Sequence, residues 1–489
     1  MTAPSTSPPT VDRHAMIIAG RAVPATSGEW LTTYDPSTGE PLAEVPRGTA
    51  PDVDRAAISA HEAYRSPEWS RRAPHERGRA LARLSRLLLN DIDQLAVMET
   101  LDSGKPLSQG KRDVQLAARY FEYYAGICDK LEGSHLPLDA EHMAVTAKEP
   151  YGVVGVIVPW NAPLNQAARA AAPALTVGNS VVLKPAEETP LTAIRLGKLA
   201  LEAGLPPGIL NVVTGLGEEA GQALVEHPLV RRISFTGSVE TGRLVAKTAA
   251  DRIIPVGLEL GGKSANIIFP DADLDTVAAS VLRTMTHSAG QICSAATRLL
   301  VHTDALNEVI ARIVATLAKV TVGPGMRDPM LGPLISRTQL DRVLGYIKLG
   351  GQEGAISVTG GARYSDGDLA RGYFVQPTVF TRVDHEMRIA NEEIFGPVVC
   401  VLPFTTEDEA LEIANNTPYG LAAGIYTRDI SRALTLARDL EAGQVFINEY
   451  QAGGVETPFG GYKQSGWGRE KGLAALDHYS QLKTTIIRL

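Results

Sequence analysis

Apolar residues recur at intervals of three and four between residues 50 and 130. The stretch 74–102 carries its arginines and acidic residues on the opposite face, and a second stretch, 114–128, is rich in aromatic residues. This spacing predicts amphipathic helices whose apolar faces pack into a core. Nothing in these helices requires a chemical role.

From residue 150 the pattern changes to short β-branched runs that alternate with Ala- and Leu-rich segments. The expected strands are 153–158, 180–185, 209–213 and 232–237, and the expected helices are 164–176, 191–203 and 217–226. Nearly continuous apolar strands alternating with helices indicate βαβ units and a parallel sheet covered on both faces. A second set of such elements, from about residue 264 onward, predicts a second α/β domain.

Two further segments have strand-like sequences without helical spacing. They are 133–149 and the C-terminal TTIIRL, 484–489. Because short isolated strands need a partner, both could form an arm that pairs with another subunit.

Composition narrows the class of protein. The 489 residues carry a net charge of −8, with 44% hydrophobic and 21% charged residues, which is ordinary for a globular protein of more than one domain. The acidic balance gives no reason to expect nucleic acid or an anionic membrane as a partner, and no apolar run reaches the roughly 18–20 residues of a membrane span. The N-terminal MTAPSTSPPT lacks the apolar core of a signal peptide, so we expect a disordered tail and a cytoplasmic protein.

The cysteines exclude some metal and disulfide chemistry. Cys128, Cys293 and Cys400 are too few and too scattered for a disulfide framework or a zinc cluster, and there is no HExxH or CxxC. We therefore expect no metal site.

Two glycine-rich turns suggest nucleotide binding. Gly217 and Gly221 follow the strand ILNVV and open a helix, and Phe235-Thr-Gly237-Ser238 also joins a strand to a helix. Glycine lets a phosphate approach the backbone at a helix N-terminus, where the helix dipole favours negative charge. Either turn could instead be a tight βα connection.

Residues 257–264 match the P-loop consensus sequence. A P-loop must run into a helix, whereas this segment runs into ANIIF, which has a strand pattern. We therefore predict that it binds no ATP or GTP.

Three residues are candidates for catalysis. Cys293 lies among small residues that leave room for a substrate, although a lone thiol is more often buried and structural. Glu259 lies between leucines, where burial would raise its pKa toward that of a general base, although it could equally be a surface residue at a strand end. Asn161 could donate to an oxyanion or simply cap a helix.

Taken together, these segments resemble the NAD(P)-dependent aldehyde dehydrogenase superfamily over nearly the whole chain. Seven motifs occur in the family's order: PWNAPL (159–164), KPAEETP (184–190), FTGS (235–238), ELGGK (259–263), GQIC (290–293), EEIFGP (392–397) and PFGGYKQSG (458–466). The resemblance implies a Rossmann-like cofactor domain, an α/β catalytic domain and a small β oligomerisation arm. The expected boundaries are a disordered tail at 1–12, the NAD-binding domain at 13–130 and 150–258, the catalytic domain at 259–448, and the arm at 131–149 and 476–489.

The resemblance also implies catalytic roles. Cys293 corresponds to the nucleophile, Glu259 to the general base, and the Asn161 amide with the main-chain N–H of Cys293 to the oxyanion hole. Glu470 corresponds to a second acid that some members use for proton relay. The expected reaction is oxidation of an aldehyde to the acid through a thiohemiacetal and a thioester.

Cofactor and partner expectations follow in the same way. Lys184 and Glu187 correspond to ligands of the adenosine ribose, and a carboxylate at Glu187 favours NAD over NADP. The resemblance implies a homodimer or homotetramer. The other expected cofactor neighbours are Trp160, Gly217, Gly221, Phe235, Gly237, Ser238, Glu393 and Phe395.

The substrate side departs from the family pattern. Ala162 stands where a phenylalanine is usual, and Ala170 where a lysine is common. If 162–176 is helical, Asn165 and Arg169 lie on the face of Asn161. Arg169 matches an arginine that semialdehyde-oxidising relatives use for a substrate carboxylate, which suggests a polar or anionic aldehyde; equally, it could pair with a protein carboxylate. The expected substrate tunnel comprises Ala162, Asn165, Gln166, Arg169, His287 and Phe459.

Two alternative functions stay open on the sequence. A CoA-acylating enzyme is one, although acylating relatives lack a glutamate at the position of Glu259. A non-catalytic NAD-binding structural protein is the other, although such a protein would not require both Cys293 and Glu259.

Overall fold

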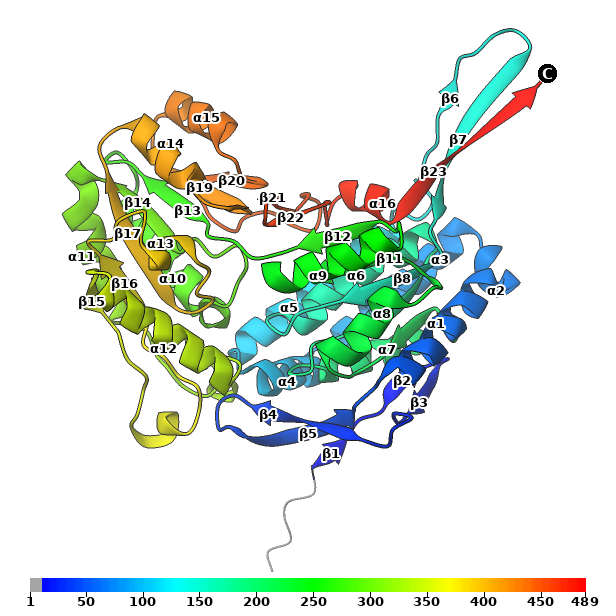
Figure 1. The fold of residues 1–489 in the computed structure, drawn as a ribbon, viewed down its shortest axis with the longest axis horizontal. Helices are drawn as coiled ribbons and strands as arrows, with labels where there is room; N and C mark the ends of the chain where they lie inside the picture. Colours follow the sequence, from blue (N-terminus) through cyan, green and yellow to red (C-terminus); the bar gives the residue numbers. More distant parts are fainter. Residues whose placement is uncertain (1–10) are drawn as a thin grey trace, which may run out of the picture.

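Two α/β halves lie side by side, and a long β arm projects from one of them (Figure 1). The computed structural model describes residues 11–489. The half from which the arm projects is built on an eight-stranded sheet of order β22-β12-β11-β8-β9-β10-β2-β3. Its strands are β2 (Met16–Ile18), β3 (Arg21–Val23), β8 (Val153–Ile157), β9 (Ser180–Lys184), β10 (Leu210–Val212), β11 (Val230–Thr236), β12 (Val256–Glu259) and β22 (Gly466–Trp467).

The five central strands, β12 to β10 in that order, are parallel and are covered on both faces. Since side chains of β8 and β9 are buried on both faces, the strands carry continuous apolar runs rather than an alternating pattern. One face packs on α3 (Pro74–Asn90), α5 (Leu107–Ala125), α6 (Pro163–Val177) and α7 (Leu191–Glu202). The other packs on α1 (Ala50–Arg65), α8 (Gln222–Glu226) and α9 (Val239–Asp251).

The second half is built on a seven-stranded sheet of order β15-β16-β17-β14-β13-β19-β20. Every pairing in it is parallel except that of β15 with β16. Its strands are β13 (Ala265–Ile268), β14 (Arg298–His302), β15 (Ile356–Thr359), β16 (Thr378–Thr381), β17 (Val398–Phe404), β19 (Ala422–Tyr426) and β20 (Gln444–Ile447). The accompanying helices are α10 (Leu274–Thr286), α11 (Leu306–Leu317), α12 (Arg337–Gln352), α13 (Arg388–Asn391), α14 (Glu407–Asn415) and α15 (Ile430–Asp439).

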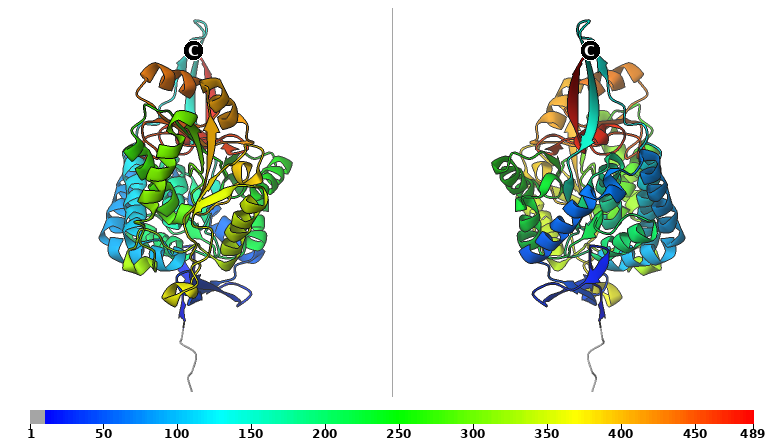
Figure 2. Two further views of the ribbon diagram at one scale, coloured as in Figure 1. Left: turned by 90° about the vertical axis from the view of Figure 1, so that its left-hand side faces the viewer. Right: turned by 90° about the vertical axis from the view of Figure 1, so that its right-hand side faces the viewer.

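The arm is a three-stranded antiparallel sheet of β6 (His135–Leu136), β7 (His142–Pro150) and β23 (Ser480–Arg488). Strands β7 and β23 pair along their whole length, from Ser480 opposite Pro150 to Arg488 opposite His142. Seen from either side, the arm extends well beyond the two halves (Figure 2). Its strands therefore lie largely outside the cores of the molecule.

The α/β fold class is confirmed, and the four strands predicted between residues 153 and 237 lie within a residue or two of the observed ones. Strand β23 begins at Ser480, four residues before the predicted C-terminal segment. The helical stretch 74–102 is two helices, α3 and α4 (Ile92–Ser103), which meet at Asp91. Helix α5 begins at Leu107 and ends at Ala125, so the prediction of 114–128 missed its first two turns. The segment 217–226 begins as a π-helical turn before α8.

The N-terminal region holds strands that the pattern did not predict. They are β2 and β3, which join the first sheet, and β1 (Asp12–Arg13), β4 (Trp30–Asp35) and β5 (Glu40–Pro46), which form a small sheet of their own. Residues 1–10 of the expected tail lie outside the described residues. Asp12, which the prediction also placed in the tail, lies in β1 and pairs with Ala43 of β5. Within residues 11–489, no helix has the length and apolar character needed to cross a membrane.

Candidate functional site

A cleft of about 910 Å³ opens where the strand order of the first sheet reverses. Strand β8 has β9 on one side and β11 on the other, and the cleft is lined by the segments that follow β8, β11 and β12. Ligands of doubly wound sheets bind at this switch point, beyond the carboxyl ends of the strands. The lining residues are Pro159, Trp160, Asn161, Gln166, Thr236, Gly237, Ser238, Val239, Glu240, Glu259, Leu260, Gly261, Cys293, Gln339, Arg342, Glu393, Phe395 and Tyr419.

Cys293 lies in the loop between α10 and β14 and is the one cysteine that lines the cleft. Cys128 and Cys400 are buried in the cores, at 1% and 0% exposure. Burial is the main reason that the pKa of the Cys293 thiol is raised to about 12; Arg169 lowers it, and Glu393 and Glu259 add smaller contributions to the rise. Access to the cleft therefore distinguishes this sulfur from the two structural thiols.

Glu259 is the last residue of β12, and its carboxylate is buried. Its Oε2 has no hydrogen-bond partner. Burial, reinforced by Glu470, raises the pKa of Glu259 well above its ordinary value, with Arg169 acting in the opposite direction. A buried carboxyl group that holds its proton toward neutral pH has the property that a general base requires.

Asn161 follows β8 and lies opposite the cysteine loop. Its Nδ2 donates to the carbonyl of Gln291 at 2.8 Å, which leaves its second amide hydrogen available to a ligand. The main-chain carbonyl of Asn161 accepts from Lys105 Nζ at 3.1 Å. Ala162, not Asn161, is the N-cap residue of α6, and no side chain caps this helix end. The amide is therefore free of the capping role that the sequence left open.

Glu470 and Arg169 form a buried ion pair behind Glu259. Glu470 also accepts from Ser234 Oγ at 3.2 Å, and this hydroxyl in turn accepts from Tyr479 at 3.1 Å. The Arg169 guanidinium lies over the ring of Phe459, 5.0 Å from its centroid. Arg169 therefore has a protein carboxylate as its partner, the alternative that the sequence left open.

The remaining tunnel residues also face protein groups. Asn165 donates to Asp113 at 3.2 Å, and His287 directly follows helix α10, where burial lowers its pKa. Of the six expected tunnel residues, only Gln166 lines the cleft. The helical spacing was correct, but the face that it identified is already occupied by acidic side chains of neighbouring elements.

The cofactor half of the cleft begins at the N-terminus of α9. Ser238 is the N-cap residue, and its Oγ accepts from the Thr241 amide. A Cβ on Gly237 would lie 2.5 Å from the ring of Phe235, so only glycine fits at this turn. Backbone amides at a thirteen-residue helix N-terminus, approached without side-chain obstruction, suit a pyrophosphate.

Glu393 faces this helix end across the cleft. It accepts from the Gly262 amide at 3.1 Å, and burial raises its pKa to about 7. The rings of Trp160 and Phe395 meet edge to face, with centroids 5.3 Å apart. A carboxylate beside two aromatic rings can bind ribose hydroxyls and a flat heterocycle, so this half of the cleft fits a nicotinamide dinucleotide.

Five predicted cofactor residues lie outside the lining of the cleft. Lys184 ends β9 and donates to Glu187 at 2.9 Å, so these two are held together as a pair. Gly217 and Gly221 lie in the π-helical turn before α8, where an added Cβ would contact no other atom. Phe235 is buried on β11, beneath the turn rather than in it.

The sequence missed three residues of the cleft that lie far from any motif, Gln339, Arg342 and Tyr419. Gln339 donates to the carbonyl of Phe395 at 2.7 Å, and Arg342 to that of Glu393 at 2.6 Å. Both lie on α12 and hold the segment that presents Glu393. No motif or charge pattern could have identified these ordinary helix residues.

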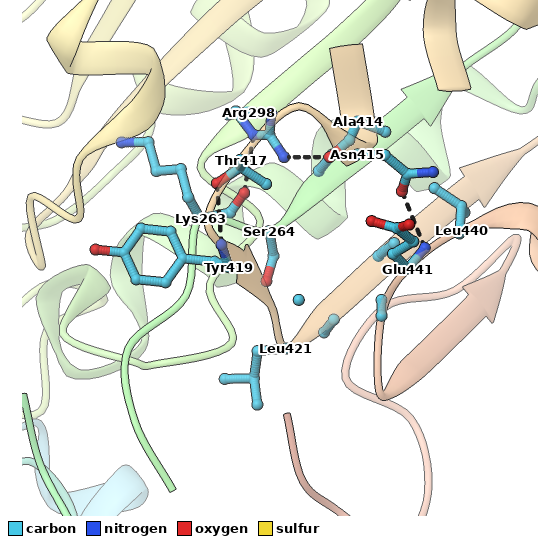
Figure 3. Close-up of a pocket in the computed structure, with 15 residues that line it drawn as sticks. Lys263, Ser264, Arg298, Ala414, Asn415, Thr417, Tyr419, Leu421, Leu440 and Glu441 are labelled. Carbon is cyan, nitrogen blue, oxygen red and sulfur yellow. Dashed lines mark hydrogen bonds between the residues drawn. The ribbon is translucent and has the colours of Figure 1, made fainter. Parts of the chain in front are cut away.

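A second, much smaller cavity is lined in part by the residues that follow the P-loop-like glycines (Figure 3). Ser264 leads into strand β13, as expected, and no helix begins there to hold a phosphate. Arg298 donates to the carbonyls of Ile413 and Ala414, each at 2.8 Å. The cavity is therefore not a P-loop site. Across the described residues, no group of three or more His, Cys, Asp or Glu side chains could hold a metal ion.

Comparison with known proteins gives consistent matches along the chain. The sequence model described as "Aldehyde dehydrogenase family" matches residues 23–485. An aldehyde dehydrogenase of Enchytraeus buchholzi is 44% identical over 497 residues, covering 100% of this chain and 99% of that relative.

Two solved structures are similar in fold and sequence. The NAD⁺ complex of an aldehyde dehydrogenase from Bacillus cereus superimposes with a TM-score of 0.96 at 41% identity, covering 98% of this chain and 97% of that one. HpcC from Thermus thermophilus superimposes with a TM-score of 0.95 at 44% identity, covering 97% of this chain and 93% of that one.

Proposed function

Because this chain belongs to the aldehyde dehydrogenase family, we propose that it oxidises an aldehyde to the carboxylic acid with NAD, using Cys293 as nucleophile and Glu259 as general base. The observation that carries the proposal is the cleft, which brings both residues and Asn161 together at the switch point. A non-catalytic role would not require a reachable thiol, a buried carboxylate and an amide donor on one surface.

In the first step the Cys293 thiol releases its proton through the cleft to solvent, and the sulfur attacks the aldehyde carbon. A C–S bond forms, and the carbonyl electron pair moves to oxygen. The Asn161 amide and the main-chain N–H of Cys293 donate to this oxyanion and stabilise it. Bound NAD would accept the hydride that leaves the same carbon, so that the C=O bond re-forms as a thioester on Cys293.

Glu259 then serves the second half of the reaction. Its carboxylate removes a proton from water, the resulting hydroxide adds to the thioester carbon, and the C–S bond breaks. The acid leaves, and the sulfur recovers a proton. We propose that Glu470, which accepts a hydrogen bond from Ser234 and whose charge raises the pKa of Glu259, exchanges protons with it.

For the cofactor, we propose NAD over NADP. The family and its NAD⁺-bound relative support a nicotinamide dinucleotide. The carboxylate of Glu187, paired with Lys184, would repel a 2′-phosphate. Replacement of Glu187 by Gln should improve kcat/KM for NADP relative to NAD; an unchanged ratio would argue against this role.

The Arg169–Glu470 pair gives no reason to restrict the substrate to aldehydes that carry a carboxylate. Binding of a substrate carboxylate by Arg169 would require this buried ion pair to open. We therefore propose Arg169 as the partner of Glu470 rather than as a ligand of a semialdehyde. Turnover of succinic semialdehyde and propanal by Arg169→Ala tests this: an unchanged ratio supports the proposal, and a selective loss of semialdehyde turnover contradicts it.

The deciding experiment measures NADH formation across aliphatic, aromatic and carboxylate-bearing aldehydes. Cys293→Ala should abolish turnover, whereas Cys128→Ala, the same change at a buried structural thiol, should retain it. Product analysis with and without CoA separates hydrolysis from acylation. Folded wild-type protein that binds NAD but oxidises no aldehyde would contradict the proposal.

We further propose a homodimer or homotetramer joined through the arm of β6, β7 and β23. The support is the row of exposed apolar residues on β23. A cytoplasmic location is also proposed, because all three cysteines carry free thiols.

A further inference from the structure

The turn that precedes Cys293 has an unusual backbone. Ser288, Ala289 and Gly290 lie consecutively in the left-handed region, with φ of 45°, 53° and 72°. Gly290 needs to be glycine, because a Cβ would lie 2.4 Å from the carbonyl oxygen of Gly396. Ser288 and Ala289 are buried L-residues in a conformation that such residues rarely adopt. The surrounding structure must therefore hold this turn in place.

Gln109, on helix α5, provides this support with its side-chain amide. Its Oε1 accepts from the Ser288 amide at 2.8 Å, and its Nε2 donates to the carbonyl of Thr286 at 3.3 Å. Thr286 is the last residue of α10, and Ser288 is the first left-handed residue. One amide thus bridges the point where the helix stops and the turn begins.

The turn is connected to the oxyanion donor by a short chain of hydrogen bonds. Gln291 Nε2 donates to the Ser288 carbonyl at 2.8 Å, and the Gln291 carbonyl accepts from Asn161 Nδ2 at 2.8 Å. A shift of Ser288 would therefore move Gln291, and with it both Cys293 and the amide of Asn161.

The face of helix α5 that carries Gln109 also supports Asn161, on the other side of the cleft. Asp113, one helical turn after Gln109, pairs with Lys105, which donates to the Asn161 carbonyl at 3.1 Å. Lys105 is 2% exposed, and Asp113 is buried. The helix thus contacts the nucleophile turn directly and supports Asn161 through Lys105, although none of its residues lines the cleft.

We propose that Gln109 is a positioning residue for the reaction: it holds the strained turn that sets Cys293 against Asn161. The inference rests on the proposed function, since it takes Cys293 as the nucleophile and Asn161 as the oxyanion donor.

The test compares Gln109→Met with Gln115→Met, the same change on the exposed face of α5. Gln109→Met should lower kcat by about 10- to 100-fold, because small misplacements of reacting groups have effects of this size. The Kd for NAD and the melting temperature should match those of Gln115→Met. Gln109→Glu keeps the acceptor for Ser288 but loses the donor to Thr286, so its kcat should be intermediate.

A double-mutant cycle with Asn161→Ala separates positioning from general support. If Gln109 acts through Asn161, the fold-loss caused by Gln109→Met should be clearly smaller in the Asn161→Ala background. Equal fold-losses in both backgrounds, or a kcat equal to that of Gln115→Met, would overturn the inference. If Gln109→Met does not fold, Gln109→Glu carries the same comparison.

The proposed function and the positioning role of Gln109 can be overturned separately. Full activity of Cys293→Ala would overturn the proposed function itself. An inactive Cys293→Ala with an unaffected Gln109→Met would overturn only the positioning role.

Discussion

At the scale of single residues, burial sets the protonation of the acids that meet in the cleft. It raises the pKa of Cys293 to about 12, that of Glu393 to about 7 and that of Glu259 well above the usual carboxyl range. All three hold their protons at higher pH than the same groups in water. The pH dependence that Glu259 and Glu393 impose should therefore lie closer to neutrality than that of a carboxyl group in water.

Glu259 should produce an acidic limb in the kcat profile. A base with a raised pKa is protonated, and therefore inactive, below that value, so kcat should fall as the pH drops toward the acid range. Glu259→Gln should lower kcat by about 100-fold or more and remove this limb. Glu132→Gln, a change at an exposed site, is the control and should keep both the wild-type kcat and the acidic limb. An acidic limb that persists in Glu259→Gln would mean that another group produces it.

Glu393 should make NAD affinity depend on pH. Its carboxylate can accept ribose hydroxyls only when ionised, so binding should weaken as the pH falls through about 7. Because the ionised fraction falls about tenfold for each pH unit below the pKa, Kd at about pH 6 should be several-fold higher than at about pH 8. Calorimetric titration of wild type and Glu393→Gln checks this, and a pH-dependent Kd in the variant would contradict it.

At the scale of elements, the general base depends on a pairing between distant parts of the chain. Strand β12 ends at Glu259, which lies opposite Gly466 of β22. Gly466 has φ of 125°, and a Cβ there would lie 1.9 Å from the Leu258 carbonyl oxygen. The C-terminal segment thus fixes the strand end that carries the base.

Gly466→Ala should disturb both stability and catalysis. The new Cβ must displace the backbone of β12, so we expect a loss of about 1–3 kcal/mol in unfolding free energy and a lower kcat. Gly345→Ala, at an exposed position of α12 where a Cβ meets no atom, is the matched control. It should leave kcat unchanged and the unfolding free energy equal or slightly higher. Urea unfolding and kcat, measured together, test the pair.

The same elements show what the sequence could and could not predict. Buried parallel strands such as β8 and β9 were recognisable because both faces are apolar, and the spacing of α6 correctly predicted a helix. Which residues oppose a given face of this helix depends on tertiary packing, so the Glu470 partner of Arg169 was not predictable. Strand β22 has only two residues and shows no pattern. Gln339 and Arg342 carry no local signal at all.

At the scale of the whole molecule, the arm leaves apolar side chains uncovered on the described chain. Leu482 and Ile486 on β23 are 66% and 64% exposed and lie on one face of the strand. Exposed apolar rows of this kind mark protein contacts. Their place on a projecting sheet fits a contact between copies of this chain.

Charge introduced on this face should break the assembly. We expect the double variant Leu482→Glu with Ile486→Glu to sediment as a smaller species than wild type, because two buried carboxylates are costly at an apolar interface. Thr485→Glu, on the opposite face, should leave the sedimentation coefficient unchanged. A wild type that already sediments as a single chain would contradict the role of the arm.

The wide separation of the two chain ends has a practical consequence for labelling. Strand β1 lies at the bottom of the molecule in Figure 1, whereas the C-terminus is at the end of β23 in the arm. There the Leu489 amide donates to the carbonyl of Glu141 at 2.7 Å. An affinity tag or fluorescent reporter added after Leu489 would extend from the edge of this sheet and crowd its neighbours. The N-terminal end is therefore the better point of attachment for a fusion.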